Sequence, residues 1–217
     1  MIHSNDYKQY PPDQLPLLVE KLKAENKKIV TLNGSFDLLH AGHLYILKKA
    51  KQQGDALIVA LNTDASIKRY KGPHRPIISL NYRLEMMAAL EMVDYVTWFD
   101  QDDPRELLKM IKPHIHVNGS EYGAECIESE VVKKGGGSIY IVEKIKGLST
   151  SAILEKINRD NLKNRLLNKE SACDLIQEGS DDATKIQQIE HCNRDQISRS
   201  STQTKTNASN CFDLCAF

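Results

Sequence analysis

Short, uninterrupted apolar runs alternate with helical patterns along most of this chain, and this alternation limits the folds open to it. The runs expected to form strands are residues 28–32, 56–61, 95–99, 115–117 and 139–142. The stretches expected to form helices are residues 13–26, 44–52, 81–92, 104–111, 125–134 and 150–158. A strand that is apolar along its whole length is buried on both faces, and helices between successive strands are typical of a parallel sheet. We therefore predict an α/β fold with a doubly wound, Rossmann-like parallel sheet.

The 217 residues divide into three regions of different character. Residues 1–27 form a leader with one helix, residues 28–158 form the α/β domain, and residues 159–217 form a polar extension. Within the extension, residues 198–210 are almost entirely Ser, Thr, Gln, Asn, Lys and Arg. Such a segment buries too little apolar surface to offset the entropy of ordering it. We expect the extension to be a disordered tail.

Charge and cysteine content exclude several classes of protein. Lys+Arg and Asp+Glu number 29 each, so the charge balance favours neither a nucleic-acid nor a membrane partner. No apolar run reaches the roughly 18 residues of a transmembrane helix, and residues 1–12 lack the apolar segment of a signal peptide. The five cysteines include no Cys-x-x-Cys pair, which argues against a zinc site and a disulfide framework. We expect a cytoplasmic protein.

A pair of histidines opens the first helix after the first strand. His40 and His43 are spaced so that both side chains lie on one helical face. The start of a helix also offers backbone N–H groups and a positive dipole end, which together bind anions. Gly42 lets a ligand approach the backbone closely. Residues 31–43 are thus predicted to form a phosphate site, although the same spacing also occurs in packed histidines and in zinc sites, for which a third ligand is not apparent.

The string that contains these histidines resembles the nucleotidyltransferases with a His-x-Gly-His motif. Residues 33–43 read Asn-Gly-Ser-Phe-Asp-Leu-Leu-His-Ala-Gly-His, and the chain is most similar to the adenylyltransferase family of ADP-heptose synthesis, which has Cys in place of Ser35. The resemblance runs from about residue 13 to residue 157. Its separated blocks are residues 54–64, 71–72, 75–77, 83, 88–91, 93–96 and 149–151.

The resemblance implies a reaction and a set of site residues. AMP would pass from ATP to a sugar 1-phosphate, D-glycero-β-D-manno-heptose 1-phosphate, with release of pyrophosphate. The implied catalytic residues are His40, His43, Lys71 and Arg83. The implied nucleotide-binding residues are Asn33, Gly34, Ser35, Phe36, Gly42, Asn118, Gly119, Glu121, Ser149, Thr150 and Ser151. The implied substrate-binding residues are Asp37, Asn62 and Asp64.

Further expectations concern the surroundings of this site. Lys71 lies in a basic stretch, residues 68–76, which we expect to be a mobile loop because it contains Gly and Pro. Lys68 and Arg69 are expected to be solvated. Mg²⁺ is expected to arrive with the nucleotide, since it prefers phosphate oxygens and water to an all-protein cage. The resemblance also allows a homodimer.

One block departs from the family pattern and leaves the substrate open. Residues 118–122 read Asn-Gly-Ser-Glu-Tyr where the family usually has Lys-Gly-Gly-Asp-Tyr, so Asn118 removes a positive charge. One alternative is a cytidylyltransferase that acts on glycerol 3-phosphate or a related alcohol phosphate. Residues 144–150 weigh against it, because they lack the Arg and Glu of that branch's Arg-Thr-Glu-Gly-Ile-Ser-Thr. A second alternative is a non-catalytic nucleotide-binding module.

Overall fold

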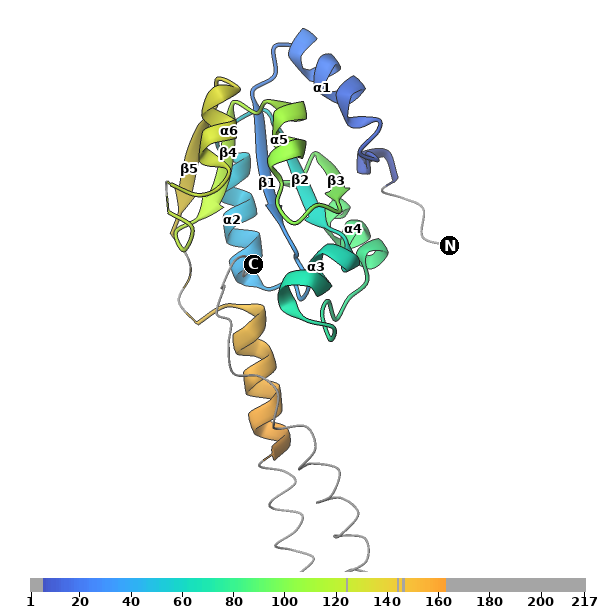
Figure 1. Cartoon of the computed structure of the whole chain (residues 1–217), viewed down its shortest axis with the longest axis vertical. Helices are drawn as coiled ribbons and strands as arrows, with labels where there is room; N and C mark the ends of the chain where they lie inside the picture. The colour runs from blue at the N-terminus through green and yellow to red at the C-terminus, as the bar shows by residue number, and fades with distance from the viewer. Residues whose placement is uncertain (1–5, 124, 144, 146, 163–217) are drawn as a thin grey trace, which may run out of the picture. The chain divides into compact units, whose positions relative to one another are not determined.

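The computed structural model describes residues 6–123, 125–143, 145 and 147–162. The chain divides into two compact units, with the boundary between residues 153 and 154. The first unit contains the α/β domain (Figure 1). From residue 163 onward, the polar extension expected from the sequence lies outside the described residues. In the described part of the chain no helix is long and apolar enough to cross a bilayer.

Five parallel strands form the sheet of the first unit, in the order β3-β2-β1-β4-β5 (Figure 1). The strands are β1 (Ile29–Gly34), β2 (Ala56–Asn62), β3 (Tyr95–Phe99), β4 (Ile115–Gly119) and β5 (Ser138–Val142). This confirms the predicted doubly wound parallel sheet. The strand order runs outward from β1 in both directions, so it reverses between β1 and β4, where open α/β sheets bind ligands.

Helices cover both faces of the sheet. They are α1 (Leu15–Ala24), α2 (Ala41–Lys51), α3 (Asp64–Lys71), α4 (Leu80–Ala88), α5 (Arg105–Ile111) and α6 (Ser129–Lys134), with a 3-10 turn at Asp6–Lys8 and a further helical stretch over residues 150–162. Strand β2 is buried at every position because it faces helices on both sides. Leu57 and Val59 pack in a cluster with α2 and α4, whereas Ile58 and Ala60 pack with α1 and α5.

The leader helix α1 belongs to this core. Its apolar positions Leu15, Leu18, Val19 and Leu22 are all buried, as their helical spacing predicts. The helix packs on the face of the sheet that carries Ile29 and Ile58. Helix α1, within the predicted leader, therefore shares a hydrophobic cluster with the strands.

The basic stretch after β2 differs from the expectation. The mobile loop predicted at residues 68–76 is wrong for Lys68, Arg69 and Lys71, which lie on α3. Thr63 caps this helix, because its Oγ1 accepts a hydrogen bond from the backbone N–H of Ser66 at 3.1 Å. Only the part from residue 72 onward is a loop. Two other helices are shorter than predicted, since α4 ends at residue 88 and α6 begins at residue 129.

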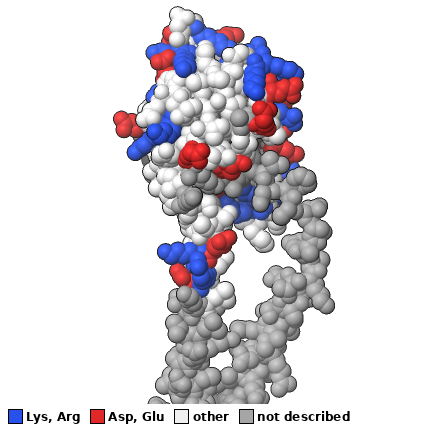
Figure 2. All heavy atoms as spheres, turned by 90° about the vertical axis from the view of Figure 1, so that its left-hand side faces the viewer, with Lys and Arg blue, Asp and Glu red and all other residues white. Residues whose placement is uncertain are grey.

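Surface charge follows the balanced composition on the face shown in Figure 2. Basic and acidic side chains are interspersed there, and large areas carry neither. Some charges of opposite sign are paired locally, such as Lys134 with Glu130 on α6, whose atoms lie 2.6 Å apart. This face therefore presents no single-sign field of the kind that attracts nucleic acid.

Candidate active site

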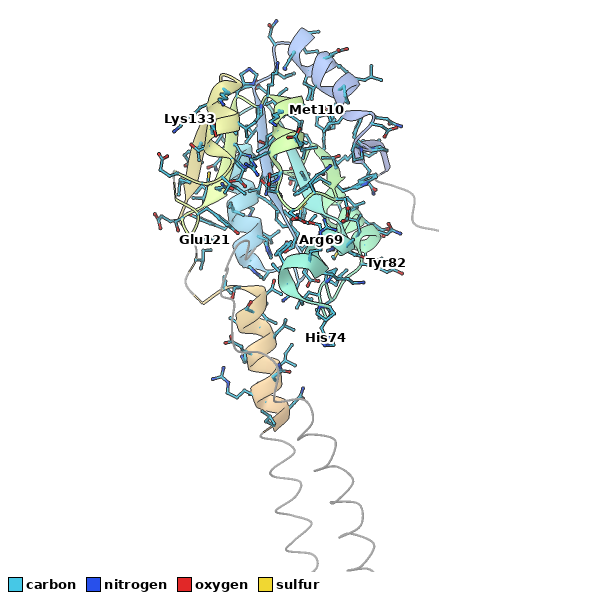
Figure 3. The ribbon with its side chains drawn as sticks, in the orientation of Figure 1. Arg69, His74, Tyr82, Met110, Glu121 and Lys133 are labelled. Carbon is cyan, nitrogen blue, oxygen red and sulfur yellow. The ribbon has the colours of Figure 1, made fainter. Side chains whose placement is uncertain are left out.

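The carboxyl ends of β1 and β4 meet at the reversal of strand order, and the segments that leave them carry most of the expected site residues. Figure 3 labels Glu121 in the segment after β4, and Arg69 and His74 on α3 and in the segment after it. Several elements distant in sequence thus contribute side chains at this end of the sheet.

His40 and His43 form a stacked pair at the start of α2. His40 is the N-cap, and its Nδ1 accepts a hydrogen bond from the backbone N–H of Gly42 at 3.1 Å. His43 Nδ1 accepts from the backbone N–H of His40 at 3.3 Å. The ring centroids lie 3.9 Å apart with 28° between the planes. Each imidazole therefore completes the hydrogen bonding of the helix start, which fixes both rings relative to the main chain.

This capping arrangement determines which ring nitrogen carries the hydrogen. Because each Nδ1 accepts a main-chain N–H, the neutral ring must hold its hydrogen on Nε2. Two Nε2–H donors are thereby placed at the positive end of the α2 dipole. Such donors suit phosphate oxygens and the negative charge that develops on them during transfer.

Gly42 makes room for the ring of His40. A Cβ built on Gly42 would lie 2.9 Å from Cε1 and 3.0 Å from Nδ1 of His40, so the missing side chain makes room for the histidine ring. Gly34 plays a similar part for Phe36, whose ring would lie 3.2 Å from a Cβ there. Phe36 is 1% exposed, has a positive φ of 45° and packs its ring against His43. These small residues shape the turn that carries the pair.

Arg83 lies at the centre of the loops around the site rather than on its surface. It is 0% exposed, and its guanidinium donates to the backbone oxygens of Ser35, Asn62 and Ile78 at 2.6, 2.9 and 3.0 Å. Its fourth contact is with the Asp64 carboxylate at 2.7 Å. The described contacts of this side chain are with protein atoms, and the phosphate contact implied by the resemblance stays a prediction. Arg83 thus ties the ends of β1 and β2 to the start of α4.

Asp37 likewise serves the protein. Its carboxylate is fully buried and accepts from Arg75 Nε at 2.7 Å and from the backbone N–H groups of Ile77 and Ile78 at 2.8 and 2.9 Å. These contacts hold the loop after α3 against the turn after β1. Asp37 therefore holds this loop in place, and its expected substrate contact stays a prediction.

Lys71 brings an ammonium group to the end of β1. Its Nζ donates to Ser35 Oγ at 3.0 Å, and the side chain is half-buried. Lys71 lies on α3, which Thr63 caps and which follows β2 directly. This helix therefore fixes the backbone position from which the Lys71 side chain extends. A positive charge therefore lies beside the segment that leads to the histidine pair.

A small pocket opens between the ends of β1 and β4. It is lined by Leu32, Asn33, Gly34, Ser35, Asn118, Gly119, Tyr122 and Glu128. Asn118 and Glu128 are 4% and 5% exposed, and Asn118 Nδ2 donates to Glu128 Oε2 at 3.4 Å. The pocket thus places two buried polar side chains beside the end of β1, from which the segment to α2 leaves.

Residues 31–156 match the protein family described as cytidylyltransferase-like. This chain belongs to that family. It is 43% identical over 152 residues to the bifunctional protein HldE of Hahella chejuensis, covering 70% of this chain and 32% of that protein. It is 44% identical over 149 residues to the bifunctional protein HldE of Pseudomonas putida strain F1, with 68% and 32% covered. The chain therefore spans about a third of the length of these curated relatives.

Among solved structures, the chain resembles a lipopolysaccharide core biosynthesis protein from Thermoplasma volcanium. The two are 32% identical with a TM-score of 0.45, over 55% of this chain and 98% of that one. The family match confirms the resemblance found in the sequence and the coarse assignment to a nucleotidyltransferase.

Residues 149–151, Ser-Thr-Ser, lie within the matched region and make contacts inside the protein. Ser149 Oγ accepts from the backbone N–H of Ala152 at 3.1 Å and so caps the helical stretch that follows. Thr150 is 7% exposed and approaches the backbone oxygen of Leu38 at 3.5 Å, whereas Ser151 is exposed. Thr150 thus contacts the segment between β1 and α2. The resemblance assigned this block to nucleotide binding.

Two further residues expected to bind substrate are also engaged inside the protein. Asn62 is 4% exposed and donates from Nδ2 to Ser66 Oγ at 3.1 Å, while Asp64 pairs with Arg83. Glu121, by contrast, has an exposed side chain. The structure therefore divides the expected residues into a buried network of protein contacts and a more exposed group that includes Glu121.

The sequence reasoning missed Glu128, Arg75 as the partner of Asp37, and His116. Glu128 has no local signal, because it precedes a short helix and looks like one of several surface carboxylates. His116 sits in an apolar strand, where its 0% exposure follows only from the sheet order. Arg75 belonged to a recognised block, but its buried partner was not predictable from spacing.

Proposed function

We propose that this chain transfers AMP from ATP to a sugar 1-phosphate, with D-glycero-β-D-manno-heptose 1-phosphate as the expected acceptor, and releases pyrophosphate. The observation that carries the proposal is the stacked pair His40 and His43, whose Nε2–H groups form a double donor at the start of α2. The choice of ATP is supported by the resemblance of the whole 13–157 region to the adenylyltransferase branch.

In the proposed reaction an oxygen of the acceptor's phosphate attacks the α-phosphorus of ATP. The bond from the α-phosphorus to the bridging oxygen breaks, and pyrophosphate leaves with that oxygen. His40 and His43 donate from Nε2 to the oxygens that gain negative charge. Most of the rate enhancement expected from this site comes from holding two anions in line and stabilising that charge.

Lys71 contributes a second positive group from α3. Its ammonium donates to Ser35 Oγ at 3.0 Å, one residue after the end of β1. We assign it to the phosphates of ATP or of the acceptor. Arg83 and Asp37 act through other residues, because their buried contacts fix the segments that carry Ser35 and Lys71.

Mg²⁺ is the cofactor implied by the nucleotide. Asp37 and Asp64 pair with Arg75 and Arg83, so neither carboxylate fits as a ligand of the ion. Among the described residues no group of three or more His, Cys, Asp or Glu is arranged to hold a metal. We therefore assign any such ion to the nucleotide's own oxygens and derive no step of the mechanism through it.

The proposal is tested by pyrophosphate release from the purified chain. ATP and CTP are each combined with heptose 1-phosphate, other sugar 1-phosphates and glycerol 3-phosphate. Release with ATP and heptose 1-phosphate supports the proposal. Release only with CTP and an alcohol phosphate makes the chain a cytidylyltransferase, and nucleotide binding without release in any pair makes it a non-catalytic module.

A further inference from the structure

We propose that Glu128, held by Asn118, selects the nucleoside part of the nucleotide by accepting hydrogen bonds from its neutral donors. These donors are the exocyclic amino group of the base or the hydroxyl groups of the ribose. The inference rests on the proposed function, because it assumes that a nucleotide occupies the pocket between β1 and β4. Glu128 would then be a specificity-determining residue.

Glu128 is a buried carboxylate that the protein itself does not neutralise. It is 5% exposed, and no ion pair to it occurs in the described part of the chain. Its side chain makes no capping hydrogen bond to α6, although it occupies the N-cap position. Its carboxylate accepts a long hydrogen bond from Asn118 Nδ2 and a further one from the Cys126 thiol, which is a weak donor. A buried charge with so few donors is costly unless a ligand supplies more.

The groups around this carboxylate are neutral as well. The side chain of Asn118 also interacts with His116, but burial lowers the pKa of His116 to about 3, so this ring carries no charge near neutral pH. Burial, followed by the charge of Glu128, raises the pKa of the Cys126 thiol. Among the described residues, no positively charged side chain therefore pairs with this carboxylate. Asn118 occupies the position where the family usually has a Lys.

The pocket gathers a second acceptor beside Glu128. Asn33 Oδ1 is buried and has no hydrogen-bond partner among the described residues, and Asn33 lines the same pocket. Two acceptors in one small cavity call for a ligand that presents donors. They also repel phosphate, so charge divides the site: anionic groups belong with His40, His43 and Lys71, and the uncharged nucleoside belongs with Glu128.

This division predicts that the site distinguishes nucleotides by the hydrogen-bond donors of their base and ribose. ATP and CTP carry an amino group where ITP and UTP carry a carbonyl oxygen, and an oxygen at that place would face the carboxylate as a second acceptor. Sites built to hydrogen-bond a donor reject analogues that lack it, since their own buried groups are then left unpaired. The 2′-hydroxyl of ribose is the other candidate, and 2′-deoxy-ATP lacks it.

The experiment measures nucleotide affinity by calorimetry and kcat/KM by pyrophosphate release, with ATP, ITP, 2′-deoxy-ATP, CTP and UTP. For the wild-type chain we expect ATP to be preferred over the analogue that lacks the critical donor by about tenfold to hundredfold. In Glu128→Gln this preference should fall to about threefold or less. Loss of preference against ITP and UTP identifies the base amino group, and loss against 2′-deoxy-ATP identifies the ribose.

Two further variants keep the test decisive. Glu125→Gln removes a carboxylate whose side chain is 92% exposed and should leave every ratio unchanged. Asn118→Lys leaves Glu128 in place but supplies an internal ammonium partner, so it should lower the same ratio even if Glu128→Gln folds poorly. Tight ATP binding with ratios unaltered in Glu128→Gln and Asn118→Lys overturns the inference alone. Failure of the wild-type chain to bind any nucleotide overturns the proposed function.

Discussion

Thr31 Oγ1 lies 2.8 Å from Nδ1 of His116 across the join between β1 and β4. The two residues are direct cross-strand partners and are 3% and 0% exposed. Burial lowers the pKa of His116 from 6.5 to about 3, against a smaller opposing effect of the Asn118 side chain. The sheet thus contains a neutral histidine beneath the pocket, and its protonation is opposed by folding.

The first prediction is that His116 makes the chain less stable in mild acid. Between pH 6.5 and about 3 the unfolded residue binds a proton that the folded residue does not, so the free energy of unfolding falls as the pH falls. His116→Gln should reduce the slope of stability against pH by up to about 1.4 kcal/mol per pH unit in this window. Urea denaturation between about pH 4 and 6 measures it. The exposed His74→Gln is the control, and equal slopes in both variants would contradict the prediction.

The second prediction compares the loss of stability on replacing a buried arginine with that on replacing an exposed one. Arg83→Met leaves three backbone oxygens and the Asp64 carboxylate without their donor, and we expect it to lower the free energy of unfolding by about 3–5 kcal/mol. Arg69→Met removes an exposed pair with Asp102 and should leave the free energy of unfolding almost unchanged, because water screens that pair. Both values come from urea denaturation at neutral pH. If Arg83→Met is as stable as Arg69→Met, the supporting role assigned to Arg83 is wrong.

The parts of this fold that the sequence could predict are those set by neighbouring residues. Strand β2 is apolar throughout because both of its faces are covered, and this alone identifies a central parallel strand. The histidine spacing and the residues around it likewise specify the start of α2. Such patterns depend on a few consecutive side chains, so they can be recognised without knowing which distant residues pack against them.

The pairing of charged residues was not predictable in the same way. Asp37 and Arg75 are 38 residues apart, and Arg83 reaches backbone oxygens that no side-chain pattern marks. Lys71 looked like part of a mobile loop because Gly72 and Pro73 follow it, although the Thr63 cap starts a helix before it. Resemblance to a family can thus point to a residue and still leave open whether its side chain contacts a ligand or supports the loop that does.

The third prediction concerns the space that Gly42 leaves for His40. In Gly42→Ala the new methyl group would lie 2.9 Å from Cε1 of His40, so the ring must move and weaken its hydrogen bond to the residue 42 backbone. We expect kcat to fall by about tenfold to hundredfold, because displacement of a positioned group by about 1 Å has effects of this size. The melting temperature should change little, since Ala favours the helix.

The matched control for this substitution is Gly135→Ala at the C-terminal end of α6. Its nearest neighbours lie at 3.4 Å or more, and it should leave kcat unchanged. A Gly42→Ala chain with wild-type kcat would show that His40 does not need its observed position. Comparison of kcat with the melting temperature of both variants distinguishes a displaced ring from a general loss of fold.

The fourth prediction tests the donor on His43. His43→Ala removes one Nε2–H from the start of α2 and should lower kcat by about tenfold to a thousandfold, the range for one lost transition-state donor. Nucleotide affinity should fall less than kcat, because the interaction strengthens as charge develops. Since His43 is 0% exposed, the same change also leaves a cavity. Ile46→Val, a substitution at the 2% exposed position on the next turn of α2, provides a packing control without loss of a donor. Wild-type kcat in a folded His43→Ala chain, or an equal loss in Ile46→Val, would remove the histidine pair from the proposed mechanism.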